Sequence, residues 1–149
     1  MEKKILIFMT AVLVLMIAAV IFIPSPKKKN NPAPPPPNAT SPNLKLYNLV
    51  PNQVISSPLI ILGESRSWYF EGSFPVKLVD EKMNLITAVP AEAKGDWMTN
   101  EFVPFEVQLK FQPPASAKGF VILEKDNPSG LEKNAESVQI PVIFKNSEK

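Results

Sequence analysis

The sequence has 149 residues, of which 45% are hydrophobic and 17 are proline, so it has room for one domain of ordinary size. Cysteine and histidine are both absent, which excludes disulfides, thiolate nucleophiles, imidazole bases and most transition-metal sites. Of the 16 basic and 14 acidic residues, five and one respectively precede position 44, which leaves 11 basic and 13 acidic residues after it. Because nucleic-acid binders present a basic face, this weakly acidic part predicts no nucleic-acid partner.

The first predicted element is a membrane-spanning helix at residues 5–23. These nineteen residues contain Thr10 as their only polar side chain. At 1.5 Å per residue they make ~28 Å of helix, close to the ~30 Å thickness of the hydrocarbon core. A removed signal peptide is the alternative, but the apolar run is long and no small-x-small cleavage pattern follows it. We therefore expect residues 1–23 to form a short cytoplasmic tip and an uncleaved anchor in the membrane.

The charges that flank this helix do not settle its orientation. Lys3 and Lys4 lie on one side and Lys27 to Lys29 on the other, so the positive-inside rule barely discriminates. A short tail ahead of a strongly apolar run resembles a signal-anchor, in which the amino terminus stays inside. This favours a single-pass protein of the cell membrane whose C-terminal domain is extracytoplasmic.

Residues 24–43 form a proline-rich stalk. Eight of these twenty residues are proline, and most of the others are small or polar. Such a segment favours the polyproline II conformation at ~3.1 Å per residue and behaves as a semi-rigid spacer. A ligand for a polyproline-binding domain at Pro34 to Pro37 is the alternative interpretation.

Residues 44–149 show the short alternating apolar patterns of β-strands. Alternation is clearest at 105–111 and 138–144, and a period of two indicates strands with one buried face. Other candidate strands lie at 53–56, 59–63, 68–79, 85–89 and 119–125. About seven short strands separated by turn residues predict an all-β, immunoglobulin-like antiparallel sandwich. Three of the prolines fall inside strand-like runs, where they indicate edges, bulges or strand switches: Pro75, Pro104 and Pro141.

Four strings in this part resemble one known family. They are VISSPL with Gly63, WYFEGSFPV from Trp68, GDWMT from Gly95, and DNPSG from Asp126 ahead of Ile140-Pro141-Val142. Together they resemble the immunoglobulin-like domain of bacterial spore germination, the Gmad family. The resemblance implies a bacterial, extracytoplasmic immunoglobulin-like sandwich without catalytic residues. The chain departs from the usual family context because it shows no germination-type partner domain.

Aromatic residues are the candidates for binding a partner. Trp68, Tyr69, Phe74 and Trp97 could contact a protein or stack on sugar rings if they are exposed. The alternative is that they form the core, because a buried tryptophan is typical of such sandwiches. The predicted function is an interaction or scaffold module of the bacterial cell envelope that binds an envelope protein. A carbohydrate or cell-wall polymer module is the alternative.

Acidic residues provide two weaker hypotheses. Two carboxylates suffice for glycoside hydrolysis, but the spacing of Glu71, Asp96 and Glu101 does not indicate that they converge. Oxygen ligands for Ca²⁺ are present at 80–81 and 126–127, but without a D-x-D-x-D-G repeat. We therefore expect no enzymatic activity, no cofactor and no bound metal.

Overall fold

The computed structural model describes residues 41–145 of the chain. In this range it contains eight strands and one short 3₁₀-helix, which are β1 (Leu44–Leu46), β2 (Gln53–Ile55), β3 (Leu59–Ser65), β4 (Ser73–Asp80), β5 (Leu85–Ala93), β6 (Val103–Leu109), β7 (Lys118–Glu124), η1 (Glu132–Asn134) and β8 (Ser137–Phe144). No helix within it is long and apolar enough to cross a membrane. The expected anchor at 5–23 and the stalk up to residue 40 lie outside the described residues.

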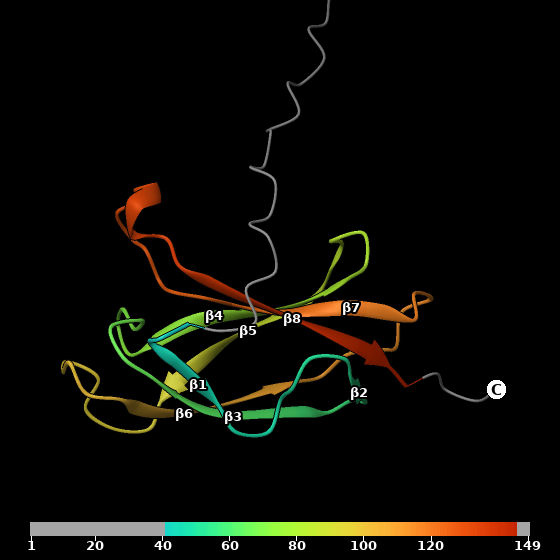
Figure 1. Cartoon of the computed structure of the whole chain (residues 1–149), viewed down its shortest axis with the longest axis horizontal. Helices are drawn as coiled ribbons and strands as arrows, with labels where there is room; N and C mark the ends of the chain where they lie inside the picture. The colour runs from blue at the N-terminus through green and yellow to red at the C-terminus, as the bar shows by residue number, and fades with distance from the viewer. Residues whose placement is uncertain (1–40, 146–149) are drawn as a thin grey trace, which may run out of the picture. The chain divides into compact units, whose positions relative to one another are not determined.

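All eight strands belong to one curled sheet in the order β1-β3-β6-β5-β4-β7-β8-β2. In Figure 1, β3 and β6 lie in one layer, β4, β7 and β8 lie in the other, and β5 passes between them. The register explains this arrangement. β5 pairs with β4 along its length, whereas its pairing with β6 is limited to Glu92 and Ala93. The sheet can therefore fold over at the β5–β6 junction and enclose a core between its two layers.

The predicted all-β, immunoglobulin-like sandwich is confirmed, with differences in detail. Eight strands are present where about seven were expected, because the three-residue β1 is too short to show a period. Every strand pair is antiparallel except β2 with β8, which is parallel. The burial of β6 alternates strictly, as its sequence predicts.

The predicted strand at 68–79 is wrong over its first five residues. β4 begins at Ser73, and the residues before it form a turn in which Glu71 and Gly72 have φ values of 52° and 80°. These left-handed values are incompatible with an extended strand. The backbone N–H groups of Phe70 and Ser73 each donate to the carbonyl of the other, at 3.1 and 3.2 Å, and so close the turn. The sequence did not indicate this turn, because the run of aromatic residues before it is typical of a strand.

The core depends on aromatic rings that contact one another across strands. Phe74 lies 5.5 Å from Trp68 and 5.0 Å from Phe105 between ring centroids, both in edge-to-face geometry. Such pairs stabilise by about 0.5–1.5 kcal/mol beyond the burial of their area. Phe74 comes from β4 and Phe105 from β6, so this contact joins the two layers. A second ring pair, Phe111 with Phe144, lies at 5.9 Å.

Two glycines leave space that the aromatic rings occupy. A Cβ atom on Gly63 of β3 would lie 2.4 Å from the Lys45 carbonyl oxygen and 2.7 Å from the Phe105 ring. On Gly119 of β7 it would lie 2.2 Å from the Val79 carbonyl oxygen. These distances are far below van der Waals contact. Packing therefore requires glycine at both positions. The backbone conformation does not, because it is that of an ordinary strand.

Replacement of Gly63 by alanine tests this packing. We expect Gly63→Ala to lower the free energy of unfolding by roughly 1–3 kcal/mol, the usual range for overpacking a filled core. The matched control is Gly95→Ala, because the only atom near a Cβ there is a Val103 methyl carbon at 4.0 Å. Urea unfolding of the two variants, followed by circular dichroism, provides the measurement. Equal stability of the two would contradict the packing argument.

Candidate functional site

The strand register places each connection at one of two ends of the sandwich. The pairs Ser65 with Val103 and Glu124 with Ser137 mark one end, which carries the connections 66–72, 94–102 and 125–136. We call it the loop end. The pairs Leu59 with Leu109 and Asp80 with Gly119 mark the opposite end, which carries 56–58, 81–84 and 110–117. Since Ser41 forms a bridge with Leu44, the described chain begins at the loop end.

The four predicted partner-binding residues divide into two pairs. Trp68 and Phe74 have no exposed surface, because they pack against each other inside the core. The prediction of partner contact is corrected for these two, whose role here is structural. Tyr69 and Trp97 are partly exposed, and both lie at the loop end. Any aromatic contact with a partner at this end depends on them and on neighbours that the first selection left out.

Trp97 is held by the turn ahead of β4. A Cβ on Gly72 would lie 3.3 Å from the indole Nε1 of Trp97, so the ring lies directly against this glycine. The turn is also tied to β5, because the Ala93 N–H donates to the Gly72 carbonyl at 2.8 Å. Two connections far apart in the sequence, 66–72 and 94–102, are thereby fixed side by side.

Two exposed apolar side chains accompany these aromatics. Phe70 is 44% exposed and Met98 is 77% exposed, and they adjoin Tyr69 and Trp97 in the chain. We name Tyr69, Phe70, Trp97 and Met98 the loop-end patch. Neither Phe70 nor Met98 is among the four residues that the sequence predicts to bind a partner. The position of Met98 could have indicated its exposure, because a methionine that follows Trp97 in a loop does not pack into the core.

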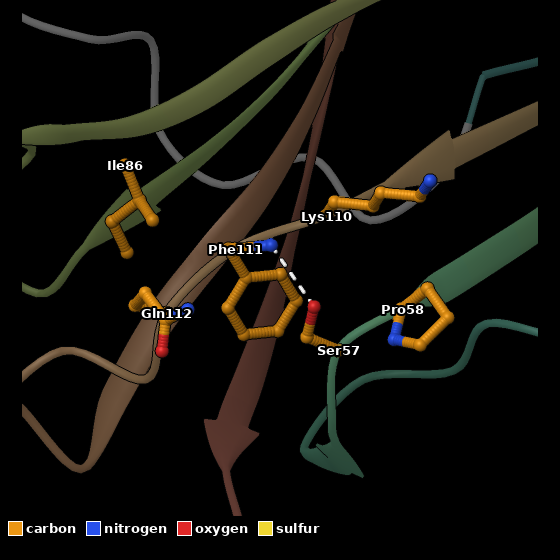
Figure 2. Close-up of a pocket in the computed structure, with 6 residues that line it drawn as sticks. All are labelled: Ser57, Pro58, Ile86, Lys110, Phe111 and Gln112. Carbon is orange, nitrogen blue, oxygen red and sulfur yellow. Dashed lines mark hydrogen bonds between the residues drawn. The ribbon is translucent and has the colours of Figure 1, made fainter.

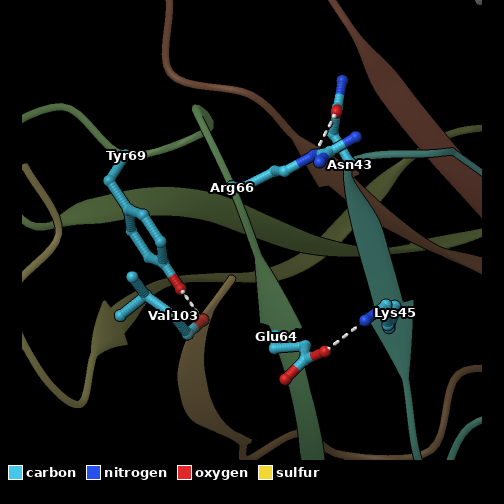
Figure 3. Close-up of polar contacts among 6 residues, drawn as sticks. All are labelled: Asn43, Lys45, Glu64, Arg66, Tyr69 and Val103. Atoms are coloured by element: carbon cyan, nitrogen blue, oxygen red, sulfur yellow. Dashed lines mark hydrogen bonds and ion pairs between the residues drawn. The ribbon is translucent and has the colours of Figure 1, made fainter. Parts of the chain in front are cut away.

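Polar contacts fix the base of this patch (Figure 3). The Tyr69 hydroxyl donates to the Val103 carbonyl at 2.8 Å, and the Arg66 Nε donates to the Asn43 side-chain oxygen at 3.0 Å. Burial raises the pKa of Tyr69, while the neighbouring Ser65 hydroxyl acts in the opposite direction. The phenol therefore stays protonated as a donor near neutral pH.

The beginning of the described chain is bound to the same end. Lys45 and Glu64 form an ion pair at 2.6 Å, and the Lys45 ammonium lies 3.8 Å from the centre of the Phe102 ring. The hydrogen bond from Lys45, followed by one from Tyr47, lowers the pKa of Glu64. Ser41 and Asn43, which the sequence assigns to the stalk, both hydrogen-bond to Glu136. The contacts of the sandwich thus begin before residue 44.

A cavity lies at the opposite end. It has a volume of about 590 Å³ and is lined by Ser57, Pro58, Ile86, Lys110, Phe111 and Gln112. Figure 2 shows the Phe111 ring between Ile86 on one side and Ser57 on the other. The Phe111 N–H donates to the Ser57 hydroxyl at 3.0 Å. The sequence analysis missed this cavity, because its residues come from three separate segments that no local pattern connects.

The two acidic segments considered for Ca²⁺ lie at opposite ends of the sandwich. Asp80 belongs to the far end, where it accepts hydrogen bonds from the backbone of Lys82 and Asn84 and from the Asn84 side chain. The Asn84 side chain is the main cause of a lowered Asp80 pKa. Asp126 lies at the loop end, so the two candidate Ca²⁺ segments are apart. Between residues 41 and 145, no three acidic side chains gather to hold a metal ion.

The comparisons with known proteins give one match. A family model described as the immunoglobulin-like domain of bacterial spore germination matches residues 48–132, which is more than half of the chain. The match includes both connections that carry the loop-end patch and ends before β8. No curated protein and no solved structure matches.

The different burial of the two tryptophans gives a direct measurement. We expect acrylamide to quench the fluorescence of Trp97, which is partly exposed, and to leave that of the fully buried Trp68 almost unaffected. Trp97→Phe should therefore leave a single blue-shifted, poorly quenched emission with unchanged circular dichroism. If quenching in Trp97→Phe equals that of the unchanged protein, the assignment of Trp97 to the surface is wrong.

Proposed function

Because the chain belongs to the family of immunoglobulin-like domains of bacterial spore germination, we propose that it is a germination-related binding module of the cell envelope. In this proposal, residues 5–23 anchor it in the membrane, residues 24–43 act as a spacer, and the sandwich binds an envelope protein outside the cytoplasm. The module has no enzymatic activity of its own. The observation that carries the proposal is the loop-end patch.

The patch has the properties of a protein-binding surface. Met98 and Phe70 expose large apolar surface at a loop tip, where a monomer gains nothing from it. Aromatic residues and methionine are enriched in the centres of protein interfaces, and tryptophan is among the residues that contribute most to affinity. The side chains also rest on a fixed base, since Gly72 supports Trp97 and Val103 holds Tyr69. A preformed surface loses little conformational entropy on binding.

The chemistry of the patch favours binding over catalysis. The carboxylates nearest in sequence, Glu71 and Asp96, lie in two different connections, and Asp96 accepts a hydrogen bond from the Met98 N–H at 3.1 Å. With no histidine or cysteine in the chain, an acid–base pair would have to be built from carboxylates, lysines or tyrosines. The cavity at the opposite end does not include Trp97 or Phe70. Exposed apolar side chains at a loop tip support a protein partner better than a sugar ligand.

Photocrosslinking in cells tests the protein partner. The full chain carries a photoreactive amino acid in place of Met98 at the loop end, or, as the matched control, in place of Val50, which is 59% exposed in the connection between β1 and β2. We expect a discrete protein adduct from position 98 and not from position 50. Adding Trp97→Ala should reduce the adduct at least about tenfold, as loss of a central interface tryptophan does.

Other outcomes of this experiment decide between the alternatives. An adduct at position 98 that disappears after digestion of the cell wall would support the carbohydrate or cell-wall polymer module instead. Absence of any adduct at position 98 during growth, sporulation and germination would contradict the binding proposal at this patch.

The proposed anchoring has its own test. We expect the full chain to remain with membranes after extraction at alkaline pH, because an apolar segment of nineteen residues spans the bilayer. Protease added outside cells without walls should remove the sandwich. A chain that is released by alkaline extraction, or a sandwich that is protected until the cells are lysed, would overturn the anchor or its orientation.

A further inference from the structure

The strand β5 has a long unpaired edge. It is nine residues long, and β4 pairs with it from Leu85 to Glu92. On its other side, β6 pairs only with Glu92 and Ala93. From Leu85 to Ala91 this edge has no backbone partner among residues 41–145. We call the opening between β5 and β6 the seam.

The register shows which backbone groups face the seam. Pro75 and Pro90 lie opposite each other in the β4–β5 pair, and neither has an N–H, so this pair cannot exchange hydrogen bonds. Because hydrogen-bonded and non-hydrogen-bonded pairs alternate, Lys77 with Ala88 is also non-hydrogen-bonded. The N–H and C=O of Ala88 and the C=O of Pro90 therefore point away from β4. They point towards β6.

The β6 side of the seam follows by the same reasoning. Leu62 uses its C=O for the Tyr47 N–H and its N–H for the Asn48 side chain, both on the β1 side. Its partner Glu106 must therefore direct its backbone groups away from β3, in agreement with its pairing to Glu92. Gln108, two residues further along, has the same orientation. Its N–H and C=O thus also face the seam.

Pro90 explains why the ladder stops. Continuation of the Glu92–Glu106 register would bring Pro90 opposite Gln108. Proline cannot donate to that pair, and prolines in sheets occur at edges for this reason. No backbone pair between β5 and β6 is formed from this point towards Leu85 and Leu109. The presence of proline at position 90 therefore accounts for the end of the β5–β6 ladder.

The edge of β3 next to β1 is covered where β1 ends. β1 and β2, the two terminal strands of the order, are three residues each. Beyond β1, the Asn48 side chain donates to the Ile60 carbonyl at 2.9 Å and accepts from the Leu62 N–H at 2.8 Å, as a neighbouring strand would. Short strands and covered edges are common means of preventing unwanted pairing. The edge of β5 from Leu85 to Ala91 has no such cover among residues 41–145.

The cavity described above lies at the wide end of the seam. Ile86 comes from β5, and Lys110, Phe111 and Gln112 follow directly after β6. The pocket is widely open to solvent, Pro58, Ile86 and Phe111 form its apolar wall, and Lys110 adds a positive charge at the rim. The segments 80–84, 110–118 and 145 at this end contain four lysines and two acidic residues. The end is therefore positively charged.

We propose that the seam accepts an extended segment of a partner polypeptide as an added strand. Only an extended backbone offers donors and acceptors at the spacing of Ala88 and Pro90. An apolar side chain of the segment enters the cavity between Ile86 and Phe111, and a carboxylate of the segment lies near Lys110. This site is separate from the loop-end patch, so a single sandwich holds two partners or two parts of one.

The test uses the full chain in lipid nanodiscs and a displayed library of random nine-residue peptides. We expect selected peptides to alternate apolar and polar residues and to carry an acidic residue. Synthetic copies should lose binding when alternate backbone amides are N-methylated. Amide exchange at Ala88 should be fast in the free chain and at least about tenfold slower with peptide, the effect of one added hydrogen bond.

Three variants sharpen the test. Ala88→Pro removes the donor that faces the seam and leaves the β4 ladder intact, so it should weaken peptide binding at least about tenfold. Ala88→Ser keeps the N–H and serves as the matched control with unchanged affinity. Lys110→Glu should select against acidic peptides. Crosslinking from position 98 should be the same in all three variants, which separates this proposal from the function proposed for the loop end.

Several results would overturn the proposal. These are a library that gives no peptide above background, equal peptide binding by Ala88→Pro and Ala88→Ser, or slow exchange of the Ala88 amide in the free chain. Self-association that Ala88→Pro abolishes without any peptide would replace the partner segment by a second copy of the chain.

Discussion

The structure depends on β5 belonging to both layers of the sandwich. It is paired with β4 from Leu85 to Glu92, and at its last two residues it is paired with β6. At that same end Phe74 contacts Trp68 and Phe105, so the backbone junction and the aromatic core reinforce each other. The loop end is therefore closed by hydrogen bonds and aromatic rings together. At the other end the layers are held by side chains such as Phe111 and Phe144.

This asymmetry explains why the two ends have different surfaces. The closed end can support exposed side chains, because the connection 66–72 is hydrogen-bonded both to β5 and to the connection 125–136. The open end presents backbone groups and a cavity instead. In our two proposals, one end binds its partner through side chains and the other through backbone groups. The two modes differ in physical basis, since buried apolar area is non-directional whereas strand pairing fixes register and direction.

The sequence predicted the fold class better than it predicted the surfaces. Alternation at 105–111 and 138–144 identified β6 and β8, because a half-buried strand must repeat every two residues. It failed at 68–72, where five consecutive residues include three aromatics and the turn depends on positive φ at Glu71 and Gly72. Pro90 was not recognised as a ladder end, because that role exists only relative to Gln108 on another strand. A local sequence pattern indicates on which face of its strand a residue lies. It does not indicate which residue lies opposite on the neighbouring strand.

The partner-binding residues show the same limit. Trp68 and Trp97 are the same residue type in similar aromatic surroundings, yet one is fully buried and the other partly exposed. What separates them is the turn at Gly72, which directs the chain so that Trp68 enters the core and leaves room above the glycine for Trp97. A side chain at position 72 would meet the indole ring and would also have to adopt a φ of +80°, which L-residues avoid. This single glycine therefore couples the packing of the core to the display of the patch. A variation in the turn would change the surface that a partner meets before it changed the fold.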